Sequence, residues 1–318
     1  MEYRTLGSTG ISVSEIGFGA WAIGGDAWGP VDDEASVAAM QRALELGVTF
    51  IDTADVYGDG HSEELVGKVI KGRRSEVVVA TKGGLMGHHR DPAGAPVYDH
   101  PDKVCRALED SLRRLGTDYV DVYYDHIWWD RPEEREAFVE ALARLKADGK
   151  VRAAGLSTDD IDYIRHFDSG GGLDVVQVEY SVLNRRAEHE ILPYLAAHDI
   201  GAVLRGPLQK GLLTGKFTAD TTFPEGDVRA DWPEQDWYRR DLARVDRLRG
   251  LEREDATLGQ LALRFVLDHP AVSSAIPGGK TPEQVAANAA ASAMPALTAA
   301  ERQLIDDVAP GGALRHTG

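Results

Sequence analysis

Four ionisable side chains stand at or near the ends of short apolar runs. Asp52 ends Phe50-Ile51-Asp52, and Tyr57 lies five residues beyond it. Lys82 ends Val79-Ala80-Thr81-Lys82, and His126 follows Tyr123-Tyr124-Asp125. Together these four types suit one task, the donation of a proton to a carbonyl oxygen while a hydride reaches the carbonyl carbon.

The four residue types divide this task between them. A free tyrosine titrates near pH ~10, and a neighbouring lysine ammonium lowers that pKa by favouring the phenolate. Asp52 would keep Lys82 charged and aimed, and His126 would orient the substrate oxygen. Each residue alone has a structural explanation, such as a helix cap or a solvated rim. Only their combination at strand ends favours an active site.

The elements that must position these residues alternate along the chain. Short apolar runs, typical of buried strands, are followed by longer amphipathic runs, typical of helices. The sequence predicts strands over 15–21, 48–52, 77–81, 119–124, 153–156, 175–180, 202–204 and 272–276. It predicts helices over 33–46, 62–70, 101–115, 132–146, 160–166, 188–197, 257–267, 282–291 and 298–308.

Eight strand–helix pairs in strict alternation favour an α/β fold, a closed (β/α)8 TIM barrel. The alternative, a Rossmann-type sheet, would need a Gly-x-Gly-x-x-Gly turn after the first strand, and the sequence has none there. Residues 3–13 predict a β-hairpin before the barrel, and a long insertion over 206–254 follows strand seven. We expect a single domain over residues 1–318.

Composition limits the partners. The formal net charge of −17 disfavours nucleic acid and anionic membrane surfaces. A single cysteine, Cys105, excludes an internal disulfide, and no stretch approaches 18 apolar residues. We therefore expect a protein of the reducing cytoplasm. No His/Cys cluster has metal-ligand spacing, and the pair His88-His89 is expected to be exposed.

The sequence resembles the aldo-keto reductases over nearly its whole length, in particular the long-chain bacterial type related to channel β-subunit-like members. The segments that carry the resemblance are 17–21, 52–58, 81–83, 121–126 and 277–288. It implies a (β/α)8 barrel without a metal. It also implies a catalytic tetrad of Asp52, Tyr57, Lys82 and His126, in which Tyr57 is the general acid and NADPH the hydride donor.

A phosphate site is expected at the loop after strand eight, before a helix N-terminus. Gly278 and Gly279 allow backbone N–H groups close to an anion, and Lys280 offers the charge that a 2′-phosphate needs. The resemblance assigns Gln284 and Asn288 to the adenosine end of NADPH. Ala287 departs from the family, where many relatives carry a glutamate that touches adenine.

For the rest of the cofactor, the resemblance implies contacts from Trp21, Ser157, Thr158, Gln177, Arg205, Gly206, Pro207, Leu208, Gly211 and Lys216. Arg205 stands where many relatives have an aromatic residue that stacks on nicotinamide. A guanidinium can also stack on a flat ring, but it would repel the oxidised, positively charged nicotinamide. We therefore predict that Arg205 favours NADPH over NADP⁺ and so favours reduction.

The substrate, a small carbonyl compound, should meet an aromatic mouth lined by Trp21, Tyr57, Trp128 and Trp129. Residues 83–100 could form a wall of this mouth. The insertion, with Trp232, Trp237 and Tyr238, could form a partial lid or a surface helix. Aromatic aldehydes and sugar-like carbonyls both remain open, as does the oligomeric state.

Three other functions fit parts of the sequence. Channel-associated members of the family bind NADPH and act mainly as partners, although the intact tetrad argues against a purely regulatory subunit. A sugar-type dehydrogenase would use the same site in the oxidative direction. A Schiff-base aldolase would use Lys82 as its nucleophile, and borohydride would then trap a substrate on that residue.

Overall fold

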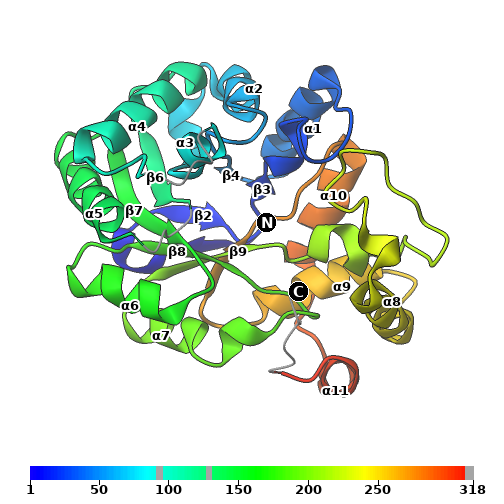
Figure 1. Cartoon of the computed structure of the whole chain (residues 1–318). Helices are drawn as coiled ribbons and strands as arrows, with labels where there is room; N and C mark the ends of the chain where they lie inside the picture. Colours follow the sequence, from blue (N-terminus) through cyan, green and yellow to red (C-terminus); the bar gives the residue numbers. More distant parts are fainter. Residues whose placement is uncertain (91–95, 127–130, 312–318) are drawn as a thin grey trace.

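Eight parallel strands form the centre of the molecule, and helices surround them (Figure 1). The computed structural model describes residues 1–90, 96–126 and 131–311. Along the sheet each strand pairs with the next one in sequence. The strands are β3 (Phe18–Gly19), β4 (Phe50–Asp52), β5 (Val78–Gly83), β6 (Val120–Asp125), β7 (Val151–Ser157), β8 (Val175–Glu179), β9 (Gly201–Arg205) and β10 (Val272–Ala275).

The first and last strands close the ring. Parallel bridges join Ile16 to Ala275 and Gly19 to Gly278, and the Gly17 amide donates to the Ala275 carbonyl at 2.8 Å. The predicted (β/α)8 barrel is therefore confirmed. The first strand is shorter than the expected 15–21, because a 3₁₀ turn (Trp21–Ile23) begins just after Gly19.

Helices cover the outside of the barrel. They are α1 (Asp33–Glu45), α2 (His61–Ile70), α3 (Leu85–Arg90), α4 (Pro101–Leu115), α5 (Pro132–Ala147), α6 (Ile161–Ser169), α7 (Ile191–Ala197), α8 (Asp236–Leu248), α9 (Leu258–Leu267), α10 (Pro282–Ala290) and α11 (Ala299–Val308). Side-chain caps begin several of them: Asp32 accepts two backbone N–H groups of α1, and Thr257 and Thr298 form capping boxes. Within the described residues, no helix has the length and apolarity to cross a membrane.

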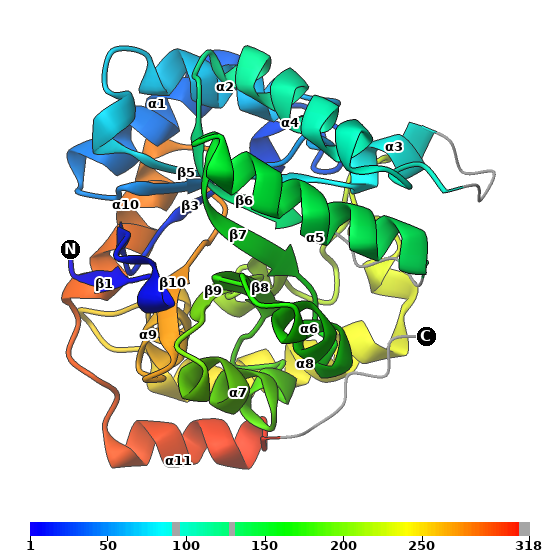
Figure 2. The same ribbon diagram turned by 90° about the vertical axis from the view of Figure 1, so that its left-hand side faces the viewer.

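The core has two parts. A larger cluster lies between the sheet and the helices, and a smaller one fills the barrel interior. The hairpin of β1 (Tyr3–Thr5) and β2 (Ser12–Ser14) adds three side chains to the interior cluster, Leu6, Ile11 and Val13. Figure 2 shows β1 at one end of the barrel and α3 at the other, so the hairpin closes the end opposite the mouth.

The insertion after β9 contains α8, which the sequence left open as a surface helix. Trp232 is 5% exposed and packs against Trp237, Tyr238 and Phe223 at ring-centroid distances of 5.1–5.8 Å. These aromatic residues thus pack against each other and against the core. They therefore belong to the core.

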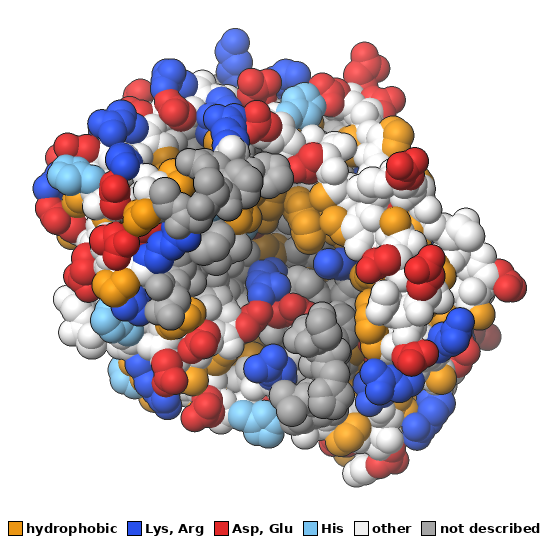
Figure 3. Space-filling view, in the orientation of Figure 1, with side chains coloured by type: hydrophobic (Ala, Val, Ile, Leu, Met, Phe, Trp, Pro, Cys, Tyr) orange, Lys and Arg blue, Asp and Glu red, His pale blue; other side chains and the backbone are white. Residues whose placement is uncertain are grey.

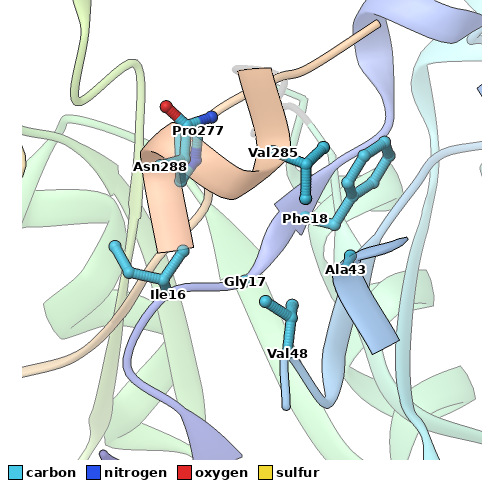
Figure 4. A pocket seen from close by; sticks show the side chains of 8 residues that line it. All are labelled: Ile16, Gly17, Phe18, Ala43, Val48, Pro277, Val285 and Asn288. Atoms are coloured by element: carbon cyan, nitrogen blue, oxygen red, sulfur yellow. The ribbon is translucent and has the colours of Figure 1, made fainter. Parts of the chain in front are cut away.

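A small cavity of about 10 Å³ lies outside the barrel wall, between β3, α1 and α10 (Figure 4). Apolar side chains such as Phe18, Val48 and Val285 point into it. A space of this size accommodates at most one water molecule. The cavity is therefore no substrate pocket, and the chemistry has to be sought at the mouth of the barrel.

Candidate active site

Strand alternation explains why the predicted side chains meet. Residues two apart on a strand point the same way. Phe50, Ala80 and Tyr124 belong to the barrel interior, so Asp52, Lys82 and His126, each two residues further on, point inward as well, toward the C-terminal mouth. The barrel thus brings together three of the four residues by the geometry of neighbouring strands alone.

Lys82 stands at the centre of the group. Its Nζ donates to Asp52 Oδ1 at 2.6 Å, to the Thr53 carbonyl at 2.8 Å and to the Tyr57 hydroxyl at 3.1 Å. The side chains of Lys82 and Asp52 are 0% and 3% exposed, so the ion pair is withdrawn from water. All three hydrogen bonds that an ammonium can donate are made, and one of them is aimed at the phenol.

The turn after β4 fixes Tyr57. Its amide donates to the Ala54 carbonyl at 3.3 Å, and Gly58 follows with φ of 62°. A Cβ on Gly58 would lie 2.0 Å from the Gly24 carbonyl oxygen, so only glycine allows this close approach. The Tyr57 ring stacks on Trp21 at 6.1 Å and meets the His126 ring edge-on at 5.7 Å.

Burial changes the pKa of Tyr57 in a direction that the sequence did not predict. Burial raises the pKa of Tyr57 above its ordinary value, and Lys82 opposes the rise without reversing it. The expected net lowering of the Tyr57 pKa is therefore wrong. Burial alone would lower the pKa of Lys82, but Asp52 and Tyr57 raise it, so the ammonium keeps its proton. Tyr57 accordingly begins as a protonated phenol, the form that a proton donor needs.

His126 is held neutral. Burial, with the charges of Lys82 and Arg205, lowers the pKa of its imidazole well below the ordinary value. Its backbone amide donates to the Gly83 carbonyl at 2.8 Å, which fixes the residue at the end of β6. A neutral imidazole can donate one hydrogen bond to a substrate oxygen without competing with Tyr57 as the acid.

Three residues expected to contact the cofactor lie on two neighbouring strands: Ser157 ends β7, Thr158 follows it, and Gln177 lies on β8. Ser157 and Gln177 are buried and are cross-strand partners, and the Thr158 amide donates to the Gln177 carbonyl at 3.1 Å. Gln177 Nε2 also donates to Asp52 Oδ2 at 2.8 Å. Gln177 therefore helps to orient the Asp52 carboxylate, which in turn holds Lys82. The sequence did not predict this contact between Gln177 and Asp52.

The loop after β10 reaches the start of α10, as expected. Gln284 Oε1 accepts from the Lys280 amide at 2.8 Å, and Asn288 Nδ2 donates to the Gly278 carbonyl at 3.2 Å. Thr281 caps the helix. Gln284 and Asn288 thus shape the loop from the same helix face.

A basic cluster lies beside this loop, made of Lys216, Arg229 and Lys280. Burial and the charge of Arg229 lower the pKa values of Lys216 and Lys280. Asp227 pairs with Arg229 at 2.7 Å, and the Arg229 guanidinium lies 4.8 Å from the Trp28 ring centroid. Cations that are crowded in this way favour a bound anion. The sequence did not predict the contact between Arg229 and Trp28, because no motif marks where the insertion returns to the barrel.

Arg205 ends β9 at the mouth, but two carboxylates hold it. Its guanidinium pairs with Asp159, and its NH1 lies 3.2 Å from Glu179 Oε2. The segment Gly206–Lys216 follows at the same end of the barrel, with left-handed backbone at Gly206 and Gly211. Lys210 of this segment lies 5.5 Å from the Trp21 ring centroid, a contact that the sequence did not predict.

Figure 3 views the molecule from the mouth and shows a hollow at its centre, bordered by basic, acidic and apolar side chains. Trp21 and Tyr57 lie together at the mouth, whereas Trp128 and Trp129 fall outside the described residues.

His88 was expected to be exposed, and this is wrong: it lies in α3, is 7% exposed, and its Nε2 contacts Glu134 Oε1 at 2.9 Å.

Comparisons with known proteins agree with this geometry. The model of the aldo/keto reductase family matches residues 15–310. The NADH-specific methylglyoxal reductase of Escherichia coli is 36% identical over 92% of this chain and 93% of its own. The holo form of aldo-keto reductase AKR11C1 from Bacillus halodurans superposes with a TM-score of 0.82 at 31% identity, covering 99% of both chains. An aldo-keto reductase from Klebsiella pneumoniae in complex with NADPH has a TM-score of 0.76 at 30% identity, covering 99% of this chain and 98% of its own. The chain belongs to the aldo/keto reductase family.

Proposed function

We propose that this protein reduces small aldehydes or ketones to alcohols with NADPH, and that Tyr57 supplies the proton. One observation carries the proposal: the Lys82 ammonium lies 2.6 Å from the Asp52 carboxylate and 3.1 Å from the Tyr57 hydroxyl, at the mouth of the barrel. A buried cation beside a phenol serves proton donation, because it stabilises the phenolate that remains.

The residues divide the work. A bound nicotinamide cofactor supplies the hydride in this chemistry. Tyr57 donates its proton to the substrate oxygen, and Lys82 stabilises the phenolate as it forms. His126 orients the same oxygen with a hydrogen bond, while Asp52 holds Lys82 in place. Trp21 shields the phenol from water by stacking on it.

The chain has residues that fit the cofactor. Gly278, Gly279 and the N-terminus of α10 offer backbone donors to a phosphate, and the cluster of Lys216, Arg229 and Lys280 offers positive charge beside them. Such a cluster is better matched to the extra phosphate of NADPH than to NADH. The Escherichia coli relative is named for NADH, so the preference has to be measured.

The test is a turnover assay on the purified protein. We expect loss of NADPH absorbance with 4-nitrobenzaldehyde and with methylglyoxal, and a kcat/KM at least about tenfold lower with NADH. Reactions without a carbonyl compound are the control. Absence of turnover across a panel of aromatic, aliphatic and sugar aldehydes would contradict the proposal. If the protein oxidised the corresponding alcohols with NADP⁺ but reduced none of the aldehydes, this would support the oxidative direction instead.

Arg205 should still influence the redox state of the bound cofactor. Because Asp159 and Glu179 offset much of its charge, we expect a modest effect: Arg205→Tyr should tighten NADP⁺ relative to NADPH by about threefold. Fluorescence titration of both cofactors measures the ratio, and Arg165→Tyr, on the outer helix α6, is the control. An unchanged ratio in Arg205→Tyr would remove the proposed bias toward reduction.

We also propose that residues 1–318 act as one barrel domain and work in the cytoplasm. The family match over 15–310 supports a single unit, and one cysteine gives no internal disulfide for an oxidising compartment to maintain. The small-molecule substrate is the expected partner.

A further inference from the structure

A second buried acid lies in the turn that carries Tyr57. Asp55 is 2% exposed, and its Oδ1 has no hydrogen-bond partner among the described residues. Its backbone amide donates to the Lys82 carbonyl at 3.2 Å, which extends the pairing of the chain with β5 beyond Asp52. Asp55 therefore fixes the position of the Tyr57 turn relative to Lys82, yet its carboxyl group has no part in the proton transfer proposed above.

Glu63, at the start of α2, competes with Asp55 for positive charge. Glu63 is 0% exposed, accepts from Arg114 Nε at 2.6 Å and from Thr81 Oγ1 at 2.5 Å, and so has the donors that an ionised carboxylate requires. Asp55 has no comparable cationic partner among the described residues. When two buried acids share one guanidinium, the proton stays on the acid with fewer donors. That acid is Asp55.

The other groups around Asp55 agree with this assignment. Burial and the charge of Glu63 raise the pKa of Asp55 to about 8, against the weaker pull of Arg114 and Lys82. Burial raises the pKa values of two neighbouring tyrosines, Tyr98 before α4 and Tyr123 on β6, and a negative charge on Asp55 would raise them further. The titratable and charged groups facing Asp55 are thus Glu63, Lys82, Tyr98, Arg114 and Tyr123.

We propose that Asp55, as an uncharged carboxylic acid, is a positioning residue that keeps the Tyr57 turn seated against Lys82. Ionisation would leave a buried negative charge without a cationic partner, and the turn would have to move or admit water to solvate it. The Tyr57 hydroxyl would then lose its alignment with Lys82. The inference rests on the proposed role of Tyr57 and adds an alkaline limit to activity.

The kinetic test is the pH profile of kcat with NADPH and 4-nitrobenzaldehyde, normalised at pH 6.5. In the wild type we expect an inflection near pH 8 and a loss of about tenfold by pH 9. Asp55→Asn, a neutral mimic of the acid, should abolish this inflection. Asp241→Asn, at a buried carboxylate paired with Arg244 on α8, is the matched control and should keep it.

A second measurement does not depend on turnover. The pKa of Asp55 is about 8 in the folded protein and ~3.9 when unfolded, so folding takes up a proton between these pH values. Stability must therefore fall as pH rises through this window, and level off above it. Asp55→Asn lacks this slope, so its Tm relative to the wild type should increase from pH 5 to pH 8.

Different results would contradict the role of Asp55 and the proposed reductase function. An alkaline inflection that persists in Asp55→Asn, or a Tm difference that stays constant from pH 5 to pH 8, would overturn the role of Asp55. Absence of turnover would overturn the reductase proposal and leave the Tm test intact. If Asp55→Asn does not fold, Glu63→Gln decides: removal of the like charge should move the inflection to lower pH, and an unmoved inflection would overturn the inference.

Discussion

Tyr57→Phe should lose about 10³-fold in kcat for aldehyde reduction, which corresponds to about 4 kcal/mol of transition-state stabilisation. The substitution removes the hydroxyl beside the Lys82 ammonium, whose proton we propose is donated to the substrate, and it keeps the ring that stacks on Trp21. Affinity for NADPH should change by less than about threefold, because the hydroxyl is proposed to act on the substrate oxygen and not on the cofactor. Single-turnover kinetics and a cofactor titration measure the two quantities separately.

Tyr194→Phe is the matched control for this variant. It removes a phenol hydroxyl of the outer helix α7, which donates to Asp168 at 2.7 Å. Its kcat should equal that of the wild type. If Tyr57→Phe kept more than about a tenth of the wild-type kcat, Tyr57 would not be the general acid.

The four-residue group could be read from the sequence because it depends on local rules. Residues two apart on a strand, such as Phe50 and Asp52, both point into the barrel, and parallel strands end at the same edge. Strand order in a βα barrel follows chain order, so neighbours in sequence are neighbours in space. The grouping of Asp52, Lys82 and His126 follows from these two facts.

Features that depend on distant contacts could not be read in this way. The residues around His88 fold into α3 because Glu134, 46 residues away, accepts from His88 and from the amides of Val97 and Tyr98. Arg229 comes close to Lys280, in the loop before α10, because the insertion folds back beside Trp28. No periodicity or motif in the sequence predicts either of these two long-range contacts.

The acidity of the site illustrates a third limit. The sequence gives the correct direction for the effect of Lys82 on Tyr57, but the net pKa depends on how deeply the phenol is buried. Burial is a property of the folded chain, and at Asp55 it turns an ordinary turn residue into an acid that stays protonated at neutral pH. The types and spacing of the residues predict which charged groups lie close together, whereas the burial of each group decides how strongly these charges shift its pKa.

The buried ion pair should dominate stability as well as activity. Lys82→Met leaves the Asp52 carboxylate buried with Gln177 as its remaining donor, and should lower the free energy of unfolding by about 3–5 kcal/mol. The double variant Lys82→Met/Asp52→Asn removes both charges and should recover much of this loss. Urea unfolding of the two single variants and the double variant gives the coupling energy.

The more accessible pair Lys146–Asp174 is the control for this cycle, because its side chains are 33% and 19% exposed, against 0% and 3% for Lys82 and Asp52. Its coupling energy should be at most about 1 kcal/mol, since water already screens both charges. A coupling energy for Lys82 and Asp52 no larger than that of the control would mean that the buried pair is not held together as the 2.6 Å contact implies.

Activity should separate from stability in the same cycle. The double variant regains its fold, but it has no ammonium beside Tyr57, so the phenolate formed by proton donation has no cation to stabilise it. We therefore expect its kcat to stay about 10²-fold or more below the wild type even where its unfolding free energy is restored. A double variant that regained both would show that Lys82 serves only to balance a buried carboxylate, and proton donation by Tyr57 would then have to depend on another group.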